Sequence, residues 1–348
     1  MFRFGFQPWH SAAEFQRLAK RFLHNGVHKL NDPRPLDRGR LNHHETITVP
    51  IAQFLESRGV DFRFHTTVVD IIMDPPTECH RVSAIQCVKA DEPKTTITLA
   101  PNDIVIVSLG SSMSGSTTGT NTTSPPLDLM EIKGDLDENW LLWLELCTKH
   151  PKFGNAYNFC TRMQESRLEA FTVTLKSPEF FNQFIALTGD QPGTGAFVTL
   201  KDSSWLLSVS LPQQPLFQDQ PSDVQVFWGH AMHPDKEGDF IKKPMVNCSG
   251  NEIMMELLHH LKFPLEKIID DSVTTPCVLP RMTTMLLPRT ASDRPRIIPE
   301  GMKNLALIGH FVEIPDEVVA TTDYGVNAAQ MAVRQLMGLQ DLGKNGKK

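Results

Sequence analysis

Two short apolar runs, far apart in the chain, constrain the fold most strongly. Ile104–Leu109 and Leu305–Ile308 are rich in aliphatic residues, and they stop at Gly110 and Gly309. Buried strands that end before a loop are typical of α/β folds, which bind ligands at the carboxyl ends of their strands. Ordinary exits from strand to loop would show the same pattern. We expect both runs to lie in one domain, interrupted by the region between them.

The periodicity of apolar residues predicts an α/β fold class, with helices and strands mixed as in α+β proteins. Spacings of three and four residues predict helices at Ser11–Leu23, Thr46–Ser57, Trp140–Cys147, Arg162–Leu175, Asn251–Leu261 and Thr321–Met337. Runs rich in β-branched residues predict further strands at Val60–Phe64, Val68–Met73, Val82–Val88, Thr95–Leu99, Trp205–Leu211 and Val224–Trp228. Ser11 and Glu14 have the spacing of a capping box at the start of the first helix.

Composition and charge exclude several classes of protein. The 34 basic and 40 acidic residues give a net charge of -6 without a long basic stripe, so we expect no nucleic-acid partner. No apolar run approaches the roughly 18 to 20 residues of a membrane-spanning helix, so we expect peripheral membrane contact at most. Six scattered cysteines and the lack of a secretory signal predict reduced thiols and a cytoplasmic location.

Histidine pairs raise the hypothesis of a metal site. They are His43–His44 and His230–His233, the second with Asp235 nearby. Neighbouring strand residues point to opposite faces, and Pro234 argues against a helix at the second pair, so we predict no metal. The sequence also contains no G-x-S-x-G nucleophile motif, no G-x-G-x-x-G and no G-x-x-x-x-G-K-[ST] phosphate loop.

The start of the last predicted helix, Thr321–Gly325, has two interpretations. Its unpaired N–H groups and the positive end of the helix dipole could stabilise an anionic ring such as a reduced flavin. Alternatively, Thr321 or Thr322 simply caps the helix. The sequence leaves both interpretations open.

Long segments of the chain resemble one known family. These segments are Phe6-Gln7-Pro8-Trp9-His10-Ser11, Trp143 through Lys149-His150-Pro151-x-Phe153-Gly154-Asn155, Gln214-Pro215 through Gln220-Pro221, Val226-Phe227-Trp228-Gly229, Pro234-Asp235-Lys236, Lys242-Lys243-Pro244-Met245 and Phe311-Val312-Glu313-x-Pro315-Asp316. In this order they resemble the flavin-containing fatty acid hydratases, or oleate hydratases, also called myosin-cross-reactive antigens.

The resemblance implies an FAD-dependent fatty acid hydratase, a hydro-lyase that adds water across the cis-9 double bond of oleic or a similar acid to give a 10-hydroxy product. A glutamate polarises water, a tyrosine protonates the alkene, and the flavin shapes or polarises the site. Such an acid must be held against the alkene in a dry pocket. The resemblance also implies two domains: residues 1–138 as a partial FAD-binding and substrate region, 139–290 as the substrate-binding region, and 291–348 as a return to the FAD-binding domain.

The sequence departs from the family at several points. Nothing in it corresponds to the Gly-rich loop and the catalytic glutamate, so we expect an N-terminally truncated chain with an incomplete dinucleotide-binding domain. His44, in the segment Asn42–Thr46, stands where the family has its acid tyrosine. The segment that grips the substrate carboxylate is Ser210–Leu216, in which Leu216 replaces a histidine. The family's C-terminal cap is cut short at Lys348.

The resemblance therefore assigns candidate site residues. They are His44 for catalysis, Val68, Ser111, Thr321 and Gly325 for FAD, and Ser210 and Gln214 for an unsaturated fatty acid. A protonated imidazole is a stronger acid than a phenol and titrates near neutrality, so a histidine could serve as proton donor. Three functions stay open: a hydratase, a non-catalytic fatty-acid-binding remnant, and another flavin enzyme of the same fold, such as an isomerase or desaturase. A homodimer also stays open.

Overall fold

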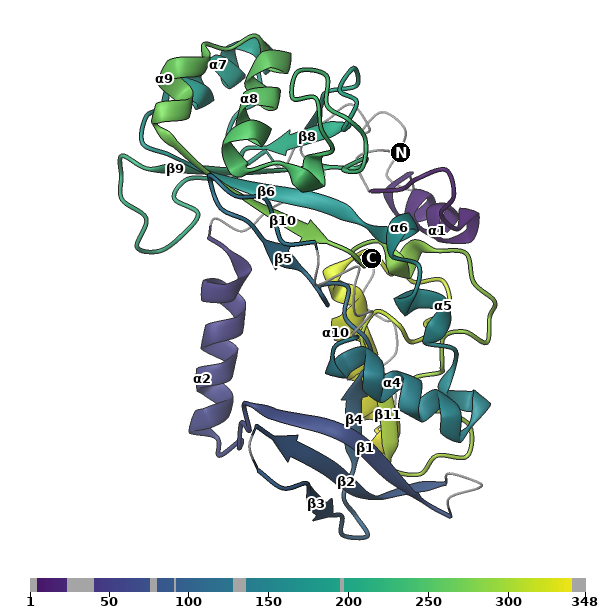
Figure 1. Cartoon of the computed structure of the whole chain (residues 1–348). Coiled ribbons are helices and arrows are strands. Elements are labelled where there is room, and N and C mark those ends of the chain that lie inside the picture. Colours follow the sequence, from purple (N-terminus) through teal and green to yellow (C-terminus); the bar gives the residue numbers. More distant parts are fainter. Residues whose placement is uncertain are drawn as a thin grey trace.

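The structure is a computed structural model that describes residues 5–23, 41–75, 80–90, 92–127, 136–194 and 197–339. Helices and strands are mixed within it, which agrees with the predicted α/β class. Strands of the described residues form sheets of six, three and two strands. The six-stranded sheet lies at one end of the molecule and the three-stranded sheet at the other (Figure 1).

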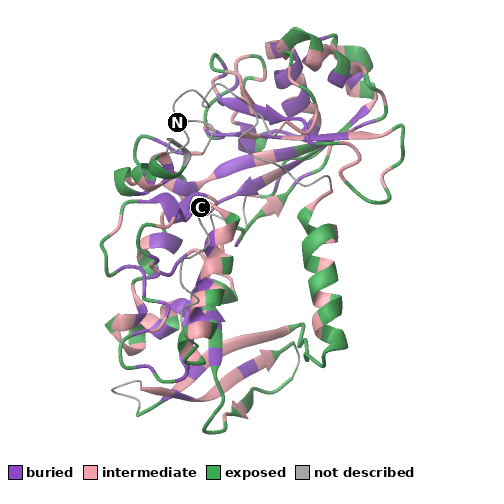
Figure 2. Cartoon of the chain, turned by 180° about the vertical axis from the view of Figure 1, so that it is seen from behind, coloured by how far each residue is buried: buried purple, intermediate pink, exposed green. Residues whose placement is uncertain are grey.

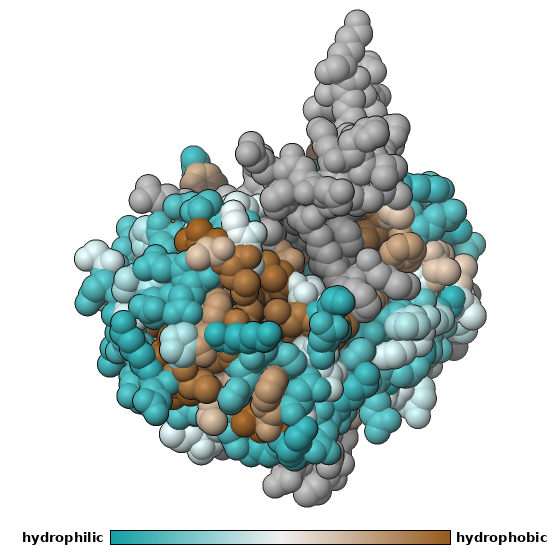
Figure 3. Space-filling view, turned by 90° about the horizontal axis from the view of Figure 1, so that it is seen from above, coloured by the Kyte–Doolittle hydropathy of each residue, from teal (hydrophilic) through white to brown (hydrophobic). Residues whose placement is uncertain are grey.

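The six-stranded sheet is antiparallel wherever its strands pair. Its order is β5 (Thr117–Thr118), β10 (Ser272–Leu279), β6 (Leu168–Leu175), β9 (Gln225–Ala231), β8 (Leu207–Ser210) and β7 (Val198–Thr199). The helices α7 (Glu179–Thr188), α8 (Gly250–Leu261) and α9 (Leu265–Asp270) lie together on one side of it (Figure 1). Seen from that end, the surface is mostly hydrophilic, with hydrophobic side chains in between (Figure 3).

Alternate residues of this sheet form a buried apolar core with the helices. Phe171, Val173 and Leu175 of β6 pack in one cluster with Phe227 of β9 and Leu257 of α8. Successive strand residues face opposite sides, so this alternation directs one face of the sheet to the helices. Complete burial of such side chains contributes about 1.5 to 3 kcal/mol each.

The two apolar runs at Gly110 and Gly309 form a pair of neighbouring strands. β4 (Val105–Ser108) and β11 (Leu305–Ile308) are parallel neighbours, with Leu305 opposite Val105. The backbone N–H of Val105 donates to the carbonyl of Asn304 at 2.8 Å. These two strands are adjacent in space, although about 200 residues separate them in the sequence.

A second buried core surrounds these two strands. It is built by Trp140 and Trp143 of α4 (Glu138–Lys149), Phe311, and Tyr324 of α10 (Thr322–Leu336). Helix α1 (Ala12–Leu23) adds Leu18 to it. The boundaries at residues 138 and 290 stay a prediction, but α4 shares its core with the first and last regions of the chain.

Short helical segments connect these cores. They are Pro151–Phe153, α5 (Tyr157–Cys160), α6 (Met163–Ser166), Met245–Asn247 and Thr284–Leu286. The predicted helix at Arg162–Leu175 is wrong, because only α6 is helical and β6 follows it. The pairing of β6 with both β9 and β10 outweighs the local helical spacing.

The three-stranded sheet has the order β1 (Thr66–Asp74), β2 (Arg81–Lys89) and β3 (Thr95–Thr98) and is antiparallel. The predicted strand at Val60–Phe64 is wrong. Those residues form a largely exposed connection from Gly59 to β1, with no sheet partner among the described residues. Without cross-strand neighbours, β-branched residues alone do not make a strand.

Helix α2 (Val49–Ser57) follows a single π-helical turn at His44–Thr48. It stands apart from the rest of the ribbon in two opposite views (Figures 1 and 2). None of its residues is buried, and its main contacts are with the π-helical turn. Among the described helices, none is both long and apolar enough to cross a membrane.

Candidate functional site

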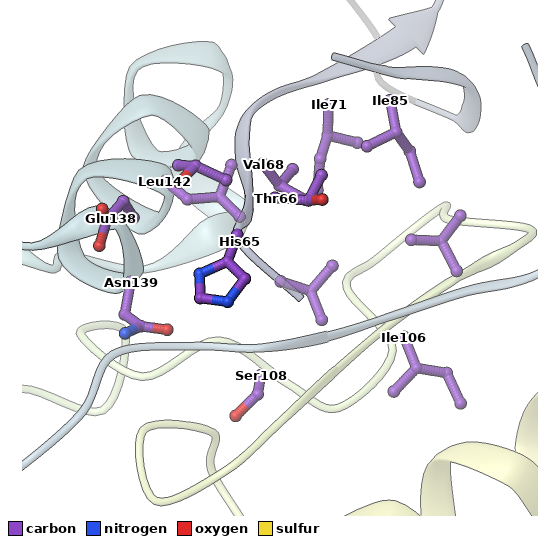
Figure 4. Close-up of a pocket in the computed structure, with 13 residues that line it drawn as sticks. His65, Thr66, Val68, Ile71, Ile85, Ile106, Ser108, Glu138, Asn139 and Leu142 are labelled. Carbon is purple, nitrogen blue, oxygen red and sulfur yellow. The ribbon is translucent and has the colours of Figure 1, made fainter. Parts of the chain in front are cut away.

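A pocket of about 510 Å³ lies where β1, β4 and α4 meet (Figure 4). Apolar side chains of the two strands line it, including Val68, Ile71, Val105 and Val107. Polar groups are added by His65, Thr66, Ser108, Glu138 and Asn139. Of the predicted cofactor residues, Val68 lies directly in this pocket.

The ends of β1 and β4 determine which polar groups the pocket contains. His65 precedes β1 with a φ of 53°, in the left-handed region that a residue with a side chain rarely adopts. Ser108 is the last residue of β4. Beyond it, Gly110 has a φ of 59°, and a Cβ atom there would lie 2.8 Å from the Phe311 ring. A glycine is needed to turn the chain toward Ser111 against this core.

The pocket has apolar walls and a polar rim. None of the described residues that line it is Lys or Arg, so they offer no cation to a pyrophosphate. Ser111 lies just beyond β4, where its carbonyl accepts a hydrogen bond from Trp140 Nε1 at 3.2 Å. Its side chain accepts from the Met113 N–H at 3.3 Å.

Thr321 and Gly325 lie at the start of α10, which packs beside β11. Thr321 is the N-cap residue, but its side chain caps nothing and donates to the Val318 carbonyl at 2.7 Å. The capping interpretation is therefore wrong for Thr321. A Cβ at Gly325 would meet nothing within 4 Å, so there is open space beside this turn. Arg21 of α1 reaches the same turn and pairs with Asp323 at 2.8 Å.

A buried ion-pair network holds α1 against the loop that precedes α10. Arg289 Nη2 lies 3.0 Å from Glu14 and 2.6 Å from Glu313. Arg17 contacts the same two carboxylates at 3.2 and 3.0 Å. Arg294 lies 3.5 Å from Glu14, and burial lowers its pKa. Sequence reasoning missed this network, because its members are distant in the chain.

The second region of interest joins the π-helical turn to the loop after β8. The backbone N–H of Asn42 donates to the Leu216 carbonyl at 2.9 Å. Glu45 Oε2 accepts from the Gln218 N–H at 2.9 Å and from Asn42 Nδ2 at 2.8 Å. The segment that holds His44 is thereby attached to the segment predicted to bind substrate, although His44 itself has an exposed side chain.

Ser210 and Gln214 have different surroundings. Ser210, the last residue of β8, is buried, and its Oγ has no hydrogen-bond partner. The Gln214 side chain is fully engaged within the protein. Its Nε2 donates to the carbonyls of Pro212 and Val226, and its Oε1 accepts from the Val226 N–H and from Gln220 Nε2. Gln214 therefore holds the loop in place. Of these two predicted substrate contacts, Ser210 is the one with an unpaired polar atom.

The predicted site residues fall into separate places. His44 lies near the loop of Ser210 and Gln214, whereas Val68 lies in the pocket at β1, β4 and α4. Between His44 and Val68 in the sequence, the nine residues of α2 span about 14 Å at 1.5 Å each. The catalytic role of His44 and the cofactor contacts of Val68 stay predictions.

Sequence reasoning also missed a cluster on α8. His260 Nε2 lies 3.1 Å from Asp239 Oδ2 and 3.3 Å from Glu256 Oε1. Glu256 is fully buried and accepts from the backbone N–H groups of Asp239, Phe240 and Ile241 at 2.7 to 2.9 Å. The Glu256 carboxylate raises the pKa of His260, although burial opposes this. The spacing of four residues between Glu256 and His260 was the available signal.

Neither histidine pair from the sequence belongs to this group. Among the described residues, ligand atoms converge within 4.8 Å only at Asp239, Glu256 and His260. Their carboxylates already accept hydrogen bonds from Ser204 and from backbone amides, so we interpret the group as an ion pair. His230 lies on β9, where burial lowers its pKa to about 4.

Glu169 is a further buried titratable residue that the sequence did not single out. It lies on β6, is fully buried, and neither of its carboxylate oxygens has a hydrogen-bond partner. Burial raises the pKa of Glu169 well above its usual range, Asp235 adds to the rise, and Arg167 opposes it. Burial without a hydrogen-bond partner therefore favours the neutral form of this acid.

Comparison with known proteins assigns the family. Residues 1–334 match the MCRA family. The chain is 33% identical over 342 residues to an oleate hydratase of Streptococcus pyogenes serotype M49 (strain NZ131), which covers 95% of this chain and 57% of the relative. It is 24% identical over 363 residues to a linoleate hydratase of Lactiplantibacillus plantarum, covering 97% of this chain and 62% of that relative. The chain thus spans less than two thirds of either relative, and it belongs to the MCRA family.

Proposed function

We propose that this protein acts in the hydration of unsaturated fatty acids. Water adds across the cis-9 double bond of oleic or a similar acid, and the product is a 10-hydroxy fatty acid with no net redox change. The names of the two relatives, an oleate and a linoleate hydratase, support this reaction class. The protein would work in the cytoplasm, and association into a homodimer or with a membrane surface stays a prediction.

One observation carries the proposal. The π-helical turn that presents His44 is hydrogen-bonded to the loop 214–220 through Asn42 and Glu45. The resemblance assigns proton donation to the first segment and the grip on the substrate carboxylate to Ser210–Leu216, which overlaps this loop. A hydratase needs both groups at one substrate molecule, and these contacts support a shared site.

His44 would supply the proton to the alkene carbon, and water would add to the other carbon. A histidine can donate this proton only from its protonated form, the imidazolium. The resemblance assigns no residue of this sequence to the glutamate that polarises water. The proposal therefore covers proton donation and substrate binding, and does not name the group that activates water.

Ser210 is the proposed contact for the fatty-acid carboxylate. A buried hydroxyl without a partner costs free energy, and a carboxylate acceptor would recover it. Gln214 would act indirectly, because its four hydrogen bonds hold the loop that connects Ser210 to Leu216.

FAD is the proposed cofactor. Val68 would contact the adenosine in the pocket at β1 and β4, Ser111 would lie beside the cofactor after β4, and Thr321 and Gly325 would meet its ring at the start of α10. When bound, the flavin would shape and polarise the site without net transfer of electrons.

The test is incubation of the protein with oleate and added FAD in ¹⁸O-labelled water, followed by mass spectrometry of the fatty acids. We expect a hydroxy fatty acid that contains one ¹⁸O atom, and less of it with His44→Ala. An isomerised or desaturated product would replace the proposal with another flavin enzyme.

A second candidate is fatty-acid binding without turnover. Leu216 cannot provide the polar contact of a histidine, and the Gln214 side chain is already saturated with hydrogen bonds. Oleate that binds but returns unlabelled would favour this candidate over hydration.

A further inference from the structure

His230 lies on the face of the six-stranded sheet that points away from α7, α8 and α9. Phe227 and Ala231 of the same strand belong to the core that packs on these helices. Successive strand residues alternate between the two faces, so Trp228 and His230 point to the opposite side.

Strand β8 brings Ser210 to the same face. In the antiparallel pairing of β8 with β9, Ser208 lies opposite His230, and Ser210 lies opposite Trp228. Residues that are directly opposite share a face, which places Ser210 and His230 on one side of the sheet. They are diagonal neighbours, with Cα atoms about 7 to 8 Å apart, a separation that an aromatic side chain can reach across.

Ser210 and His230 both have unpaired polar atoms. The Ser210 Oγ is buried without a hydrogen-bond partner. The His230 ring contacts Phe197 and Trp228, with ring centroids 5.5 and 6.2 Å away, and neither of its nitrogens has a hydrogen-bond partner among the described residues. Ser208, in contrast, shares a hydrogen bond of 2.9 Å with the Thr199 hydroxyl.

The surroundings of His230 carry no charge. Burial lowers the pKa of His230 to about 4, so the ring is neutral at physiological pH and carries one N–H donor. On the neighbouring strand β6, the residues opposite His230 and Trp228 are Ala170 and Thr172. A carboxylate that reached this face would therefore meet two unpaired donors and no acidic side chain from β6, β8 or β9.

We propose that His230 is a second contact for the fatty-acid carboxylate, donating its ring N–H to one carboxylate oxygen while Ser210 donates to the other. The proposal rests on the proposed function, in which Ser210 binds that carboxylate. Each oxygen of a carboxylate accepts hydrogen bonds of about 2.8 Å, so one carboxylate can bridge donors on two neighbouring strands. His230 would thereby supply from β9 the imidazole contact that Leu216 lacks.

The aromatic neighbours favour this contact. Phe197 packs edge-on against Trp228, with ring centroids 4.9 Å apart, and both rings lie beside His230. Apolar rings lower the local dielectric, which strengthens a hydrogen bond between an N–H group and an anion. The site should therefore distinguish a free acid from its uncharged ester.

The test measures binding rather than turnover, with the whole chain and no FAD. Oleate and methyl oleate, each below its aggregation concentration, are titrated into the parent and its variants by calorimetry. His230→Phe keeps the ring volume beside Trp228 and removes the N–H. It should weaken oleate binding about tenfold and methyl oleate binding less than threefold, because hydrogen bonds to charged groups are the stronger ones.

Two matched variants define the cause. His230→Gln keeps an N–H donor and should retain most of the affinity for oleate. His259→Ala removes a histidine from α8, on the other side of the sheet, and should bind both ligands like the parent. Thermal unfolding of each variant shows that it is folded.

Four outcomes would overturn the proposal. They are a parent that binds no oleate, a folded His230→Phe variant that binds oleate like the parent, an equal loss of oleate and methyl oleate, and a His230→Gln variant as weak as His230→Phe. The failure of hydration is a separate result. Oleate that binds with the expected dependence on His230 and returns without ¹⁸O would reject hydration and support the carboxylate contact.

Discussion

Glu45 Oε2 accepts the backbone N–H of Gln218 at 2.9 Å, which joins the turn that presents His44 to the loop after β8. The same oxygen accepts from Asn42 Nδ2 at 2.8 Å. A carboxylate that accepts two donors fixes both segments more firmly than a neutral acceptor would. This link determines how the predicted proton donor and the predicted substrate loop lie relative to each other.

The first prediction tests this link. Glu45→Ala should expose the Gln218 amide and speed its hydrogen exchange about fivefold, the equivalent of about 1 kcal/mol for one lost hydrogen bond. Hydrogen exchange followed by mass spectrometry measures it. Glu56→Ala, which removes an exposed carboxylate from α2, should leave the loop unchanged. Equal exchange in the parent and Glu45→Ala would show that the link does not hold in solution.

The second prediction concerns His44 as proton donor. The group at this position must transfer a proton to the alkene, which a tyrosine phenol can do and an alanine cannot. His44→Tyr should therefore retain or raise activity, and His44→Ala should lose most activity, as measured by product formation. If His44→Ala hydrates oleate at the parent's rate, the acid lies elsewhere.

The third prediction concerns FAD. The described residues that line the pocket at Val68 include no cation for a pyrophosphate, so the isolated chain should bind FAD weakly and lose it during gel filtration. Absorbance of the eluted protein near the flavin bands measures this. A stoichiometric yellow protein would contradict the prediction and would require a pyrophosphate site outside this pocket.

The fourth prediction concerns His260. The folded protein raises its pKa, so His260 stabilises the fold fully below the unfolded-state value near 6.5, and this stability is lost as pH rises through the folded value. The melting temperature of the parent should therefore fall across that range, and His260→Ala should flatten the decline. His259→Ala is the control, because it keeps both carboxylate contacts of His260. An unchanged slope in His260→Ala would exclude this ion pair as the cause.

The fifth prediction concerns Glu169. Burial raises the pKa of the folded Glu169 carboxyl, whereas the unfolded one ionises above about pH 4.3. Stability is thus fully present below that pH and is lost as pH rises through the folded value. Glu169→Gln should stabilise the protein more at pH 8 than at pH 5, measured by urea unfolding. Glu300→Gln, at an exposed position, should show no such difference, and an equal gain for Glu169→Gln at both pH values would disprove the assignment.

Sequence patterns correctly predicted those helices and strands that depend on residues close to one another in the sequence. Ser11 does contact the Glu14 backbone N–H, at 3.4 Å, and α1 begins at the next residue after Ser11. The strands that end before Gly110 and Gly309 were also recognisable from the sequence, because a short buried strand is an almost continuous run of apolar residues. The two runs pair as parallel strands, and the domain boundaries between them stay a prediction.

Other features depend on partners that are distant in sequence. Leu168–Leu175 has helical spacing at its start, yet it lies between β9 and β10 and becomes a central strand. The resemblance to the family assigns Gln214 as a substrate contact. Only its folded neighbours Val226 and Gln220 reveal that its polar atoms are occupied.

The sequence by itself determined the α/β class, most of the elements and the family, because periodicity and motifs reside in consecutive residues. Only the tertiary structure decided which polar groups are paired. Glu169 is left without partners while Glu256 receives three backbone N–H groups, although both are buried glutamates. Burial and hydrogen bonding are properties of the packed chain, since they depend on contacts between residues that folding alone brings together.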